Sequence, residues 1–121
     1  MSRVDSLNRI LSALQSSSPD LEASALISED GLMIASALPA HIEETRVSAM
    51  TATLLSLGTR AAMELERGEV QEVLVRGGDG YAVMMASGSG TLLLVLASKA
   101  AKLGLVFLDL RRAAEEVKKV L

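Results

Sequence analysis

The segment from Thr91 to Ala97 places the strongest constraint on the fold. Its sequence, Thr-Leu-Leu-Leu-Val-Leu-Ala, shows no alternation between polar and apolar residues. A strand with one face in water alternates, whereas a strand buried on both faces is a continuous apolar run. We therefore expect one sheet with helices on both of its sides, and Thr91–Ala97 near the centre of that sheet.

Glycine-containing turns divide the remaining strand-like segments. Asp30-Gly31 separates two apolar runs and predicts a hairpin, because both residues tolerate the positive φ of such turns. The expected strands are Ala23–Ser28, Leu32–Ala37, Val70–Arg76, Tyr81–Ser87 and Thr91–Ala97. The third of these is the most polar, which predicts a place at the edge of the sheet.

Three helical patterns complete the chain. Ser2 and Asp5 have the spacing of a capping box at the start of the first helix, and Ser16 to Pro19 end it. A long helix is expected from Glu43 to Arg67, with Gly68 at its C-terminal cap. The last begins between Ala100 and Leu105. The order helix-strand-strand-helix-strand-strand-strand-helix predicts a single α+β domain over residues 1–121, a three-layer α/β/α sandwich around a five-stranded, mostly antiparallel sheet.

The long helix is apolar over an arc roughly 160° wide, more than the ~100° that packing on one sheet requires. This arc comprises Val47, Met50, Thr51, Leu54, Leu55, Leu57, Gly58, Ala61, Ala62 and Leu65. We expect Met50, like Met84 and Met85, to fill the core. The opposite side is small and weakly charged, and we interpret it as a surface for a partner protein. Its residues are Ala49, Ala52, Thr53, Ser56, Arg60 and Met63.

Composition argues against several classes of function. The net charge is −3 and the pI about 5.1, which does not favour nucleic acid or an anionic membrane as partner. There is no cysteine and one histidine, His41, so we expect no metal and no cofactor. The glycine-rich turns lack the Gly-Lys-Ser/Thr context of a phosphate-binding loop. We expect a cytoplasmic protein that is not an enzyme and has no small-molecule substrate.

Several stretches resemble one known family. Ala25–Ser36 is similar to the first hairpin of the Roadblock (dynein light chain) family, and Val73–Gly77 followed by Gly80-Tyr81 is similar to its second. Lys102–Leu105 resembles the Leu-Gly entry to the family's last helix. Together with the order of elements, the resemblance covers nearly the whole chain. The short termini resemble the prokaryotic, stand-alone type. The family has no catalytic motif, so the resemblance implies no catalytic residues in this sequence.

The resemblance implies a dimer of two copies or of paralogues. In this family the third strands pair edge to edge, giving a ten-stranded sheet, and the long helices pack side by side. The residues then expected in the dimer interface are Thr51, Leu55, Gly58, Ala62, Val70, Glu72 and Leu74.

For function, the resemblance implies a non-enzymatic, homodimeric regulator or scaffold of a small Ras-like GTPase. The chain resembles the regulators of Mgl-type GTPases in this respect. Activation of GTP hydrolysis is one expected mode of regulation. Arg46, Arg60 or Arg67 could then act on the partner's phosphates, although solvated surface charges are the simpler interpretation. The alternative is a structural adaptor that bridges larger proteins without affecting nucleotide hydrolysis. A small-molecule sensor is disfavoured because Tyr81 and Phe107 are the only aromatic residues.

Overall fold

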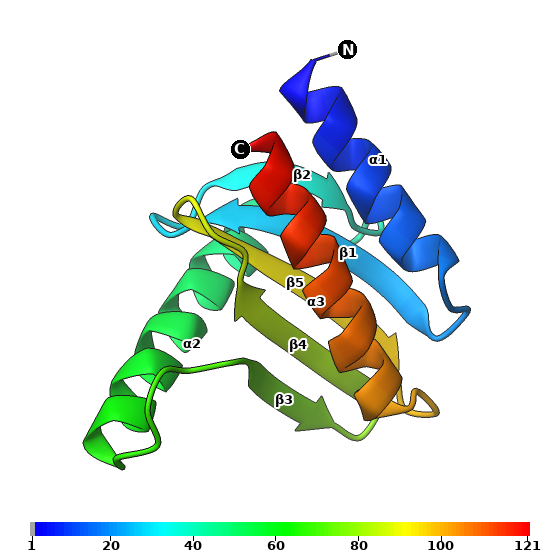
Figure 1. The fold of residues 1–121 in the computed structure, drawn as a ribbon. Coiled ribbons are helices and arrows are strands. Elements are labelled where there is room, and N and C mark those ends of the chain that lie inside the picture. Colours follow the sequence, from blue (N-terminus) through cyan, green and yellow to red (C-terminus); the bar gives the residue numbers. More distant parts are fainter. Residues whose placement is uncertain (1) are drawn as a thin grey trace.

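A computed structural model describes residues 2–121 and has the predicted order of elements (Figure 1). The elements are α1 (Arg3–Ser16), β1 (Leu21–Ser28), β2 (Met33–Ala37), α2 (Glu44–Glu64), β3 (Val73–Gly77), β4 (Gly80–Ala86), β5 (Thr91–Ser98) and α3 (Leu103–Val120). The prediction of three helices and five strands is thus confirmed. The start of α3 lies inside the expected interval.

The five strands form one sheet in the order β2-β1-β5-β4-β3, and every neighbouring pair is antiparallel. Helices α1 and α3 cover one face and α2 covers the other (Figure 1). This is the predicted three-layer sandwich. The polar strand β3 lies at one edge, also as predicted.

Strand β5 is central and supplies apolar side chains to both layers. Leu93 and Val95 belong to the core beneath α1 and α3, whereas Leu92 and Leu94 belong to the core beneath α2. Successive side chains of a strand point to opposite faces, so a strand between two cores is apolar at every position. This explains why the segment shows no alternation.

The helix starts follow the local sequence. The Ser2 hydroxyl accepts a hydrogen bond of 3.1 Å from the Asp5 N–H, and the predicted capping box is present. Before α2, the carboxylate of Glu43 accepts hydrogen bonds of 3.1 Å from the N–H groups of Thr45 and Arg46. A carboxylate here is also stabilised by the positive end of the helix dipole.

The end of α2 differs from the prediction. The residue that leaves the helix in the left-handed conformation is Glu66, with φ of 58°, and not Gly68. The N–H of Arg67 donates to the Ala62 carbonyl at 2.7 Å and the N–H of Glu66 donates to the Met63 carbonyl at 3.1 Å. These are the two hydrogen bonds of a Schellman motif. The helix therefore ends before the glycine that sequence reasoning selected.

Two further expectations were wrong in detail. The third strand was expected from Val70, but β3 begins at Val73, and residues Val70 to Glu72 belong to the connection between α2 and β3. Met50 is 53% exposed and fills no core, although Met84 and Met85 are buried as expected.

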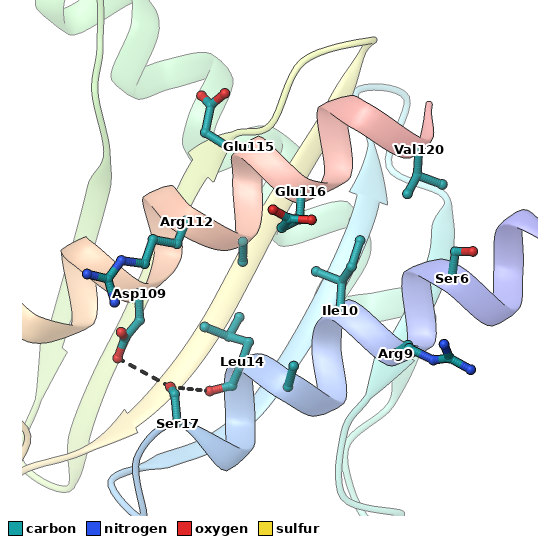
Figure 2. A pocket seen from close by; sticks show the side chains of 12 residues that line it. Ser6, Arg9, Ile10, Leu14, Ser17, Asp109, Arg112, Glu115, Glu116 and Val120 are labelled. Carbon is teal, nitrogen blue, oxygen red and sulfur yellow. Dashed lines mark hydrogen bonds between the residues drawn. The ribbon is translucent and has the colours of Figure 1, made fainter.

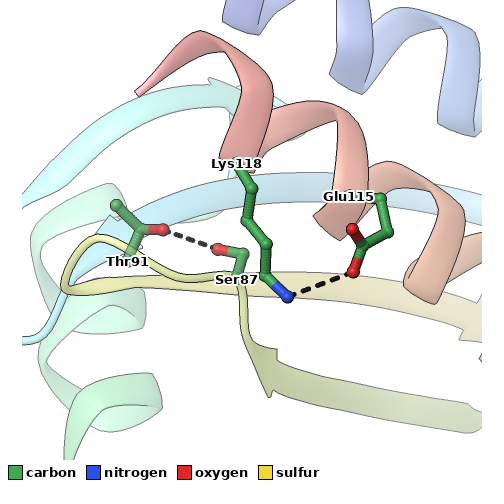
Figure 3. A network of polar contacts seen from close by, with 4 residues as sticks. All are labelled: Ser87, Thr91, Glu115 and Lys118. Carbon is green, nitrogen blue, oxygen red and sulfur yellow. Dashed lines mark hydrogen bonds and ion pairs between the residues drawn. The ribbon is translucent and has the colours of Figure 1, made fainter.

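The turn between β4 and β5 packs beneath the end of α3. Ser87 and Thr91 are buried, and their hydroxyl groups share a hydrogen bond of 2.7 Å (Figure 3). Above them, Lys118 Nζ lies 3.1 Å from a carboxylate oxygen of Glu115. A Cβ atom at Gly88 would lie 2.8 Å from Lys118 Cγ, so glycine permits this close approach.

Candidate interaction surface

Helix α2 has three distinct faces, and the first packs on the sheet. Ser48, Thr51 and Leu55 are buried on this face. The hydroxyl of Ser48 donates to the Thr45 carbonyl at 3.0 Å, and that of Thr51 donates to the Val47 carbonyl at 2.8 Å. Their burial therefore leaves no hydroxyl without a partner. Thr51 and Leu55, both expected in a dimer interface, are covered by this chain's own sheet.

The second face is an exposed apolar stripe, which we call the α2 stripe. Its exposed fractions include 54% for Leu57 and 67% for Leu65. The stripe consists of Met50, Leu54, Leu57, Ala61 and Leu65. Residues three and four positions apart adjoin on a helix, so these side chains form one continuous strip. A contiguous exposed apolar strip of this kind marks an interaction surface more often than isolated apolar residues do.

Gly58 locates the α2 stripe relative to the sheet. Its helical neighbours Leu54 and Ala61 belong to the stripe, while a Cβ atom at Gly58 would lie only 2.5 Å from Cγ2 of Val73 in β3. The stripe therefore borders the β3 side of the sheet. The close approach that Gly58 allows is made within one chain.

Strand β3 adds a second unpartnered surface next to the α2 stripe. Its outer edge pairs with no strand within residues 2–121, so its backbone N–H and C=O groups on that side are free to pair with another chain. Leu74 and Val75 are also exposed. Of the other residues expected in the dimer interface, Gly58, Ala62, Val70 and Glu72 are partly buried.

The third face of α2 is the arc expected to contact a partner. Its members Ala49, Thr53, Ser56, Arg60 and Met63 are exposed, whereas Ala52 is partly buried. The Thr53 hydroxyl donates to the Ala49 carbonyl at 2.9 Å, and Arg60 lies 3.7 Å from Glu64 in an exposed ion pair. We call the five exposed residues the outer arc.

The arginines considered as phosphate contacts are all exposed. Arg46 is near the start of α2, and Arg67 follows the end of that helix, where its Nε donates to the Leu65 carbonyl at 2.9 Å. Arg60 lies between them on the outer arc. These three residues span the length of α2 and do not converge on one point.

A groove of about 760 Å³ separates α1 from α3 (Figure 2). Ile10 and Leu14 line it with apolar surface, while Arg9, Arg112 and Glu116 stand around it. The groove carries both signs of charge, so it selects no particular ligand charge.

The described part of the chain offers little chemistry of its own. Within residues 2–121, no group of His, Asp or Glu side chains is arranged to hold a metal ion. No helix in the same range is long and apolar enough to cross a membrane. His41 is exposed in the connection before α2.

Sequence reasoning grouped the α2 stripe with the buried face, because both lie on one apolar arc. The width of the arc indicated only that the sheet cannot cover all of it. A sheet covers about 100° of a helix, so the remaining apolar residues had to face something else. The sequence could not say which half of the arc the sheet covers.

Comparison with known proteins places the chain in a family. The family model of the Roadblock/LC7 domain matches residues 7–97, and this protein therefore belongs to the Roadblock/LC7 family. It is 33% identical over 98 residues to the uncharacterized protein MJ1340 of Methanocaldococcus jannaschii, and the match covers 81% of this chain and 85% of that protein.

Solved structures share the whole fold. The Roadblock/LC7 domain from Streptomyces avermitilis superposes with a TM-score of 0.86 at 25% identity, covering 93% of this chain and 94% of that one. MglB of Myxococcus xanthus superposes with a TM-score of 0.87 at 22% identity, covering 99% of this chain and 90% of that one. At this identity the likeness to MglB is one of fold.

Proposed function

We propose that this protein is a non-enzymatic homodimer that regulates or scaffolds a small Ras-like GTPase. Membership of the Roadblock/LC7 family, whose domains are regulatory or adaptor domains, supports this proposal. The resemblance of the sequence to regulators of Mgl-type GTPases and the shared fold of MglB support it further. The lack of a metal-binding group within residues 2–121 is compatible with it.

The main observation that supports a homodimer is the position of the α2 stripe beside the free edge of β3. In the proposed dimer, the β3 strands of two copies pair through this edge to give a ten-stranded sheet. The two α2 stripes then pack against each other and leave water, at about 25 cal/mol per Å² of apolar surface buried. Thr51 and Leu55 lie on the side of α2 that packs on the sheet, so they position the helix for this interface. Its borders are formed by Gly58, Ala62, Val70, Glu72 and Leu74.

Substitution of Leu57 tests the dimer. Leu57→Arg places a charge in the middle of the α2 stripe, and we expect sedimentation to show monomers, because burying an unpaired charge is costly. Leu105→Arg is the matched control, because Leu105 is a similarly exposed leucine (58%) on α3. It should leave the dimer intact. A Leu57→Arg protein that dimerises like the wild type would place the interface elsewhere.

The outer arc is the proposed contact for the GTPase. Small side chains such as Ala49 and Ser56 let a partner's backbone approach α2 closely, and Met63 offers a flexible apolar contact. In the dimer that we propose, two such arcs would lie on the same side of the ten-stranded sheet. A GTPase could then contact one copy or both.

Hydrolysis of GTP by a small Ras-like GTPase from the same organism, measured with and without the protein, tests the regulatory role. We expect a changed rate or nucleotide affinity, and Ser56→Arg should weaken the effect while sedimentation still shows a dimer. Ser12→Arg, on the exposed side of α1, is the control. Binding without any change in hydrolysis or exchange would favour the structural adaptor, and no binding at all would refute the proposal.

A further inference from the structure

A second site lies on the other side of the sheet, at the β3–β4 turn. A pocket of about 490 Å³ is lined there by Arg76, Gly77, Gly78, Tyr81 and Lys99. Alternate residues of a strand face opposite sides, and Val73 faces α2, so Arg76 faces the α3 side. Tyr81 packs against the core beneath α1 and α3, which agrees with this placement. The pocket is thus separate from the α2 surfaces.

Gly80 brings the two basic residues of the pocket together. In the sheet it is paired with Ser98, at the end of β5. A Cβ atom at Gly80 would lie 2.4 Å from the Ala97 carbonyl oxygen, so only glycine lets the turn lie directly against β5. Arg76 before the turn and Lys99 after β5 consequently border the same pocket.

The lining of the pocket carries two positive charges in a chain whose net charge is −3, and the nearest acidic residue in the sequence is Asp79, in the same turn. None of its lining residues is acidic. Across residues 2–121, neither Arg76 nor Lys99 has a carboxylate within 4.0 Å, whereas other basic residues such as Arg60 and Lys118 do. The guanidinium carbon of Arg76 lies 5.8 Å from the centre of the Tyr81 ring, within the range of a cation–π contact.

We propose that this pocket binds the phosphate group of a small molecule. A guanidinium can donate two parallel hydrogen bonds to phosphate oxygens, and a lysine supplies a second positive charge. Two unpaired cations complement a doubly charged phosphate better than they complement a singly charged carboxylate. The volume lies within the roughly 300–1,000 Å³ typical of small-molecule sites. The turn leaves room for the ligand, because a Cβ atom at Gly78 would meet nothing within 4 Å.

Helix α3 begins four residues after Lys99. Lys102 occupies its N-cap without a side-chain hydrogen bond, and the first turn contains no acidic residue. The N-terminal end of a helix dipole favours a nearby anion. The proposed site nonetheless depends on Arg76 and Lys99, and the glycine turn itself joins two strands, unlike a phosphate-binding loop that opens a helix.

Titration of the ¹⁵N-labelled protein with inorganic phosphate, followed by NMR at constant ionic strength, tests the proposal. We expect saturable shifts concentrated at the amides of Gly77, Gly78, Tyr81 and Lys99. Acetate, a singly charged carboxylate, should give no saturable shift. Shifts that do not saturate or are scattered over the surface would overturn the proposal, and so would equal binding of acetate.

Three variants make the test specific. Arg76→Gln and Lys99→Gln each remove one charge from the exposed surface and should weaken phosphate binding about tenfold or more. Gly78→Asp should also weaken it, because it adds a carboxylate at a position with room for a side chain. Arg60→Gln is the control. Unchanged phosphate affinity in the variants with a wild-type-like spectrum elsewhere would refute the site.

This site does not rest on the proposed dimer. Leu57→Arg should retain phosphate binding even as a monomer, because Leu57 lies on α2, across the sheet from the pocket. Loss of phosphate binding in this folded monomer would show that the pocket is not complete in one chain, contrary to the proposal.

Discussion

Replacing Gly58 with alanine tests how α2 packs on β3. The new Cβ atom would lie 2.5 Å from Cγ2 of Val73, much closer than two carbon atoms can approach without strain. Valine is stiff at χ1 and cannot easily turn this methyl group aside. The helix or the strand therefore has to shift. If Gly58 were instead needed only for contact with a second copy, the single chain would accept alanine without strain.

Two opposing terms set the size of the effect. Alanine in place of glycine inside a helix is worth about 1 kcal/mol of stability. Overpacking a well-packed contact costs roughly 1–3 kcal/mol. We therefore expect Gly58→Ala to change the free energy of unfolding by about 0 to −2 kcal/mol. Gly104→Ala, in the first turn of α3, gains helix propensity with nothing within 4 Å of its new Cβ atom and should be neutral or stabilising.

Urea denaturation followed by circular dichroism measures both changes. The variant Val73→Ala provides a double-mutant cycle, because it removes the methyl group that the new Cβ atom would strike. Gly58 and Val73 should then show a coupling energy of roughly 0.5–3 kcal/mol, with Gly58→Ala tolerated better when Val73 is alanine. Repeating the series at a lower protein concentration separates packing within one chain from dimer dissociation. A Gly58→Ala protein as stable as Gly104→Ala, with no coupling to Val73, would refute this reasoning.

Two further predictions concern stability. Glu66→Gly should raise the free energy of unfolding by up to about 1 kcal/mol, because the left-handed conformation costs a non-glycine residue roughly 1–2 kcal/mol and glycine loses part of that gain in chain entropy. Ser56→Gly, in the interior of α2, should instead lower the free energy of unfolding, and urea midpoints distinguish the two variants. Leu110→Ala should lower the free energy of unfolding by about 2–5 kcal/mol, since Leu110 is fully buried; exposed Leu108→Ala should cost far less, and equal costs would contradict the assigned core.

The fold was predictable because its main signals are local or periodic. The continuous apolar run of β5 indicated a two-sided sheet, and Asp30-Gly31 indicated the first hairpin. The capping pattern of Ser2 and Asp5 marked the start of α1. The end of α2 was missed because Gly68 is the usual type of residue at a helix C-terminus, whereas the two hydrogen bonds of a Schellman motif hold Glu66 in the left-handed conformation.

The candidate surfaces were only half predictable, for a different physical reason. The sequence of α2 by itself determined that its apolar arc is too wide for one sheet and that its opposite side is small and weakly charged. Which apolar residues the sheet buries depends on how α2 is rotated about its own axis, and that rotation is set by contacts with distant residues such as Val73. Only the tertiary structure placed Leu55 in the core and Leu57 in solvent. Likewise, the sheet register that pairs Gly80 with Ser98 brought Arg76 beside Lys99, a proximity that no local pattern encodes.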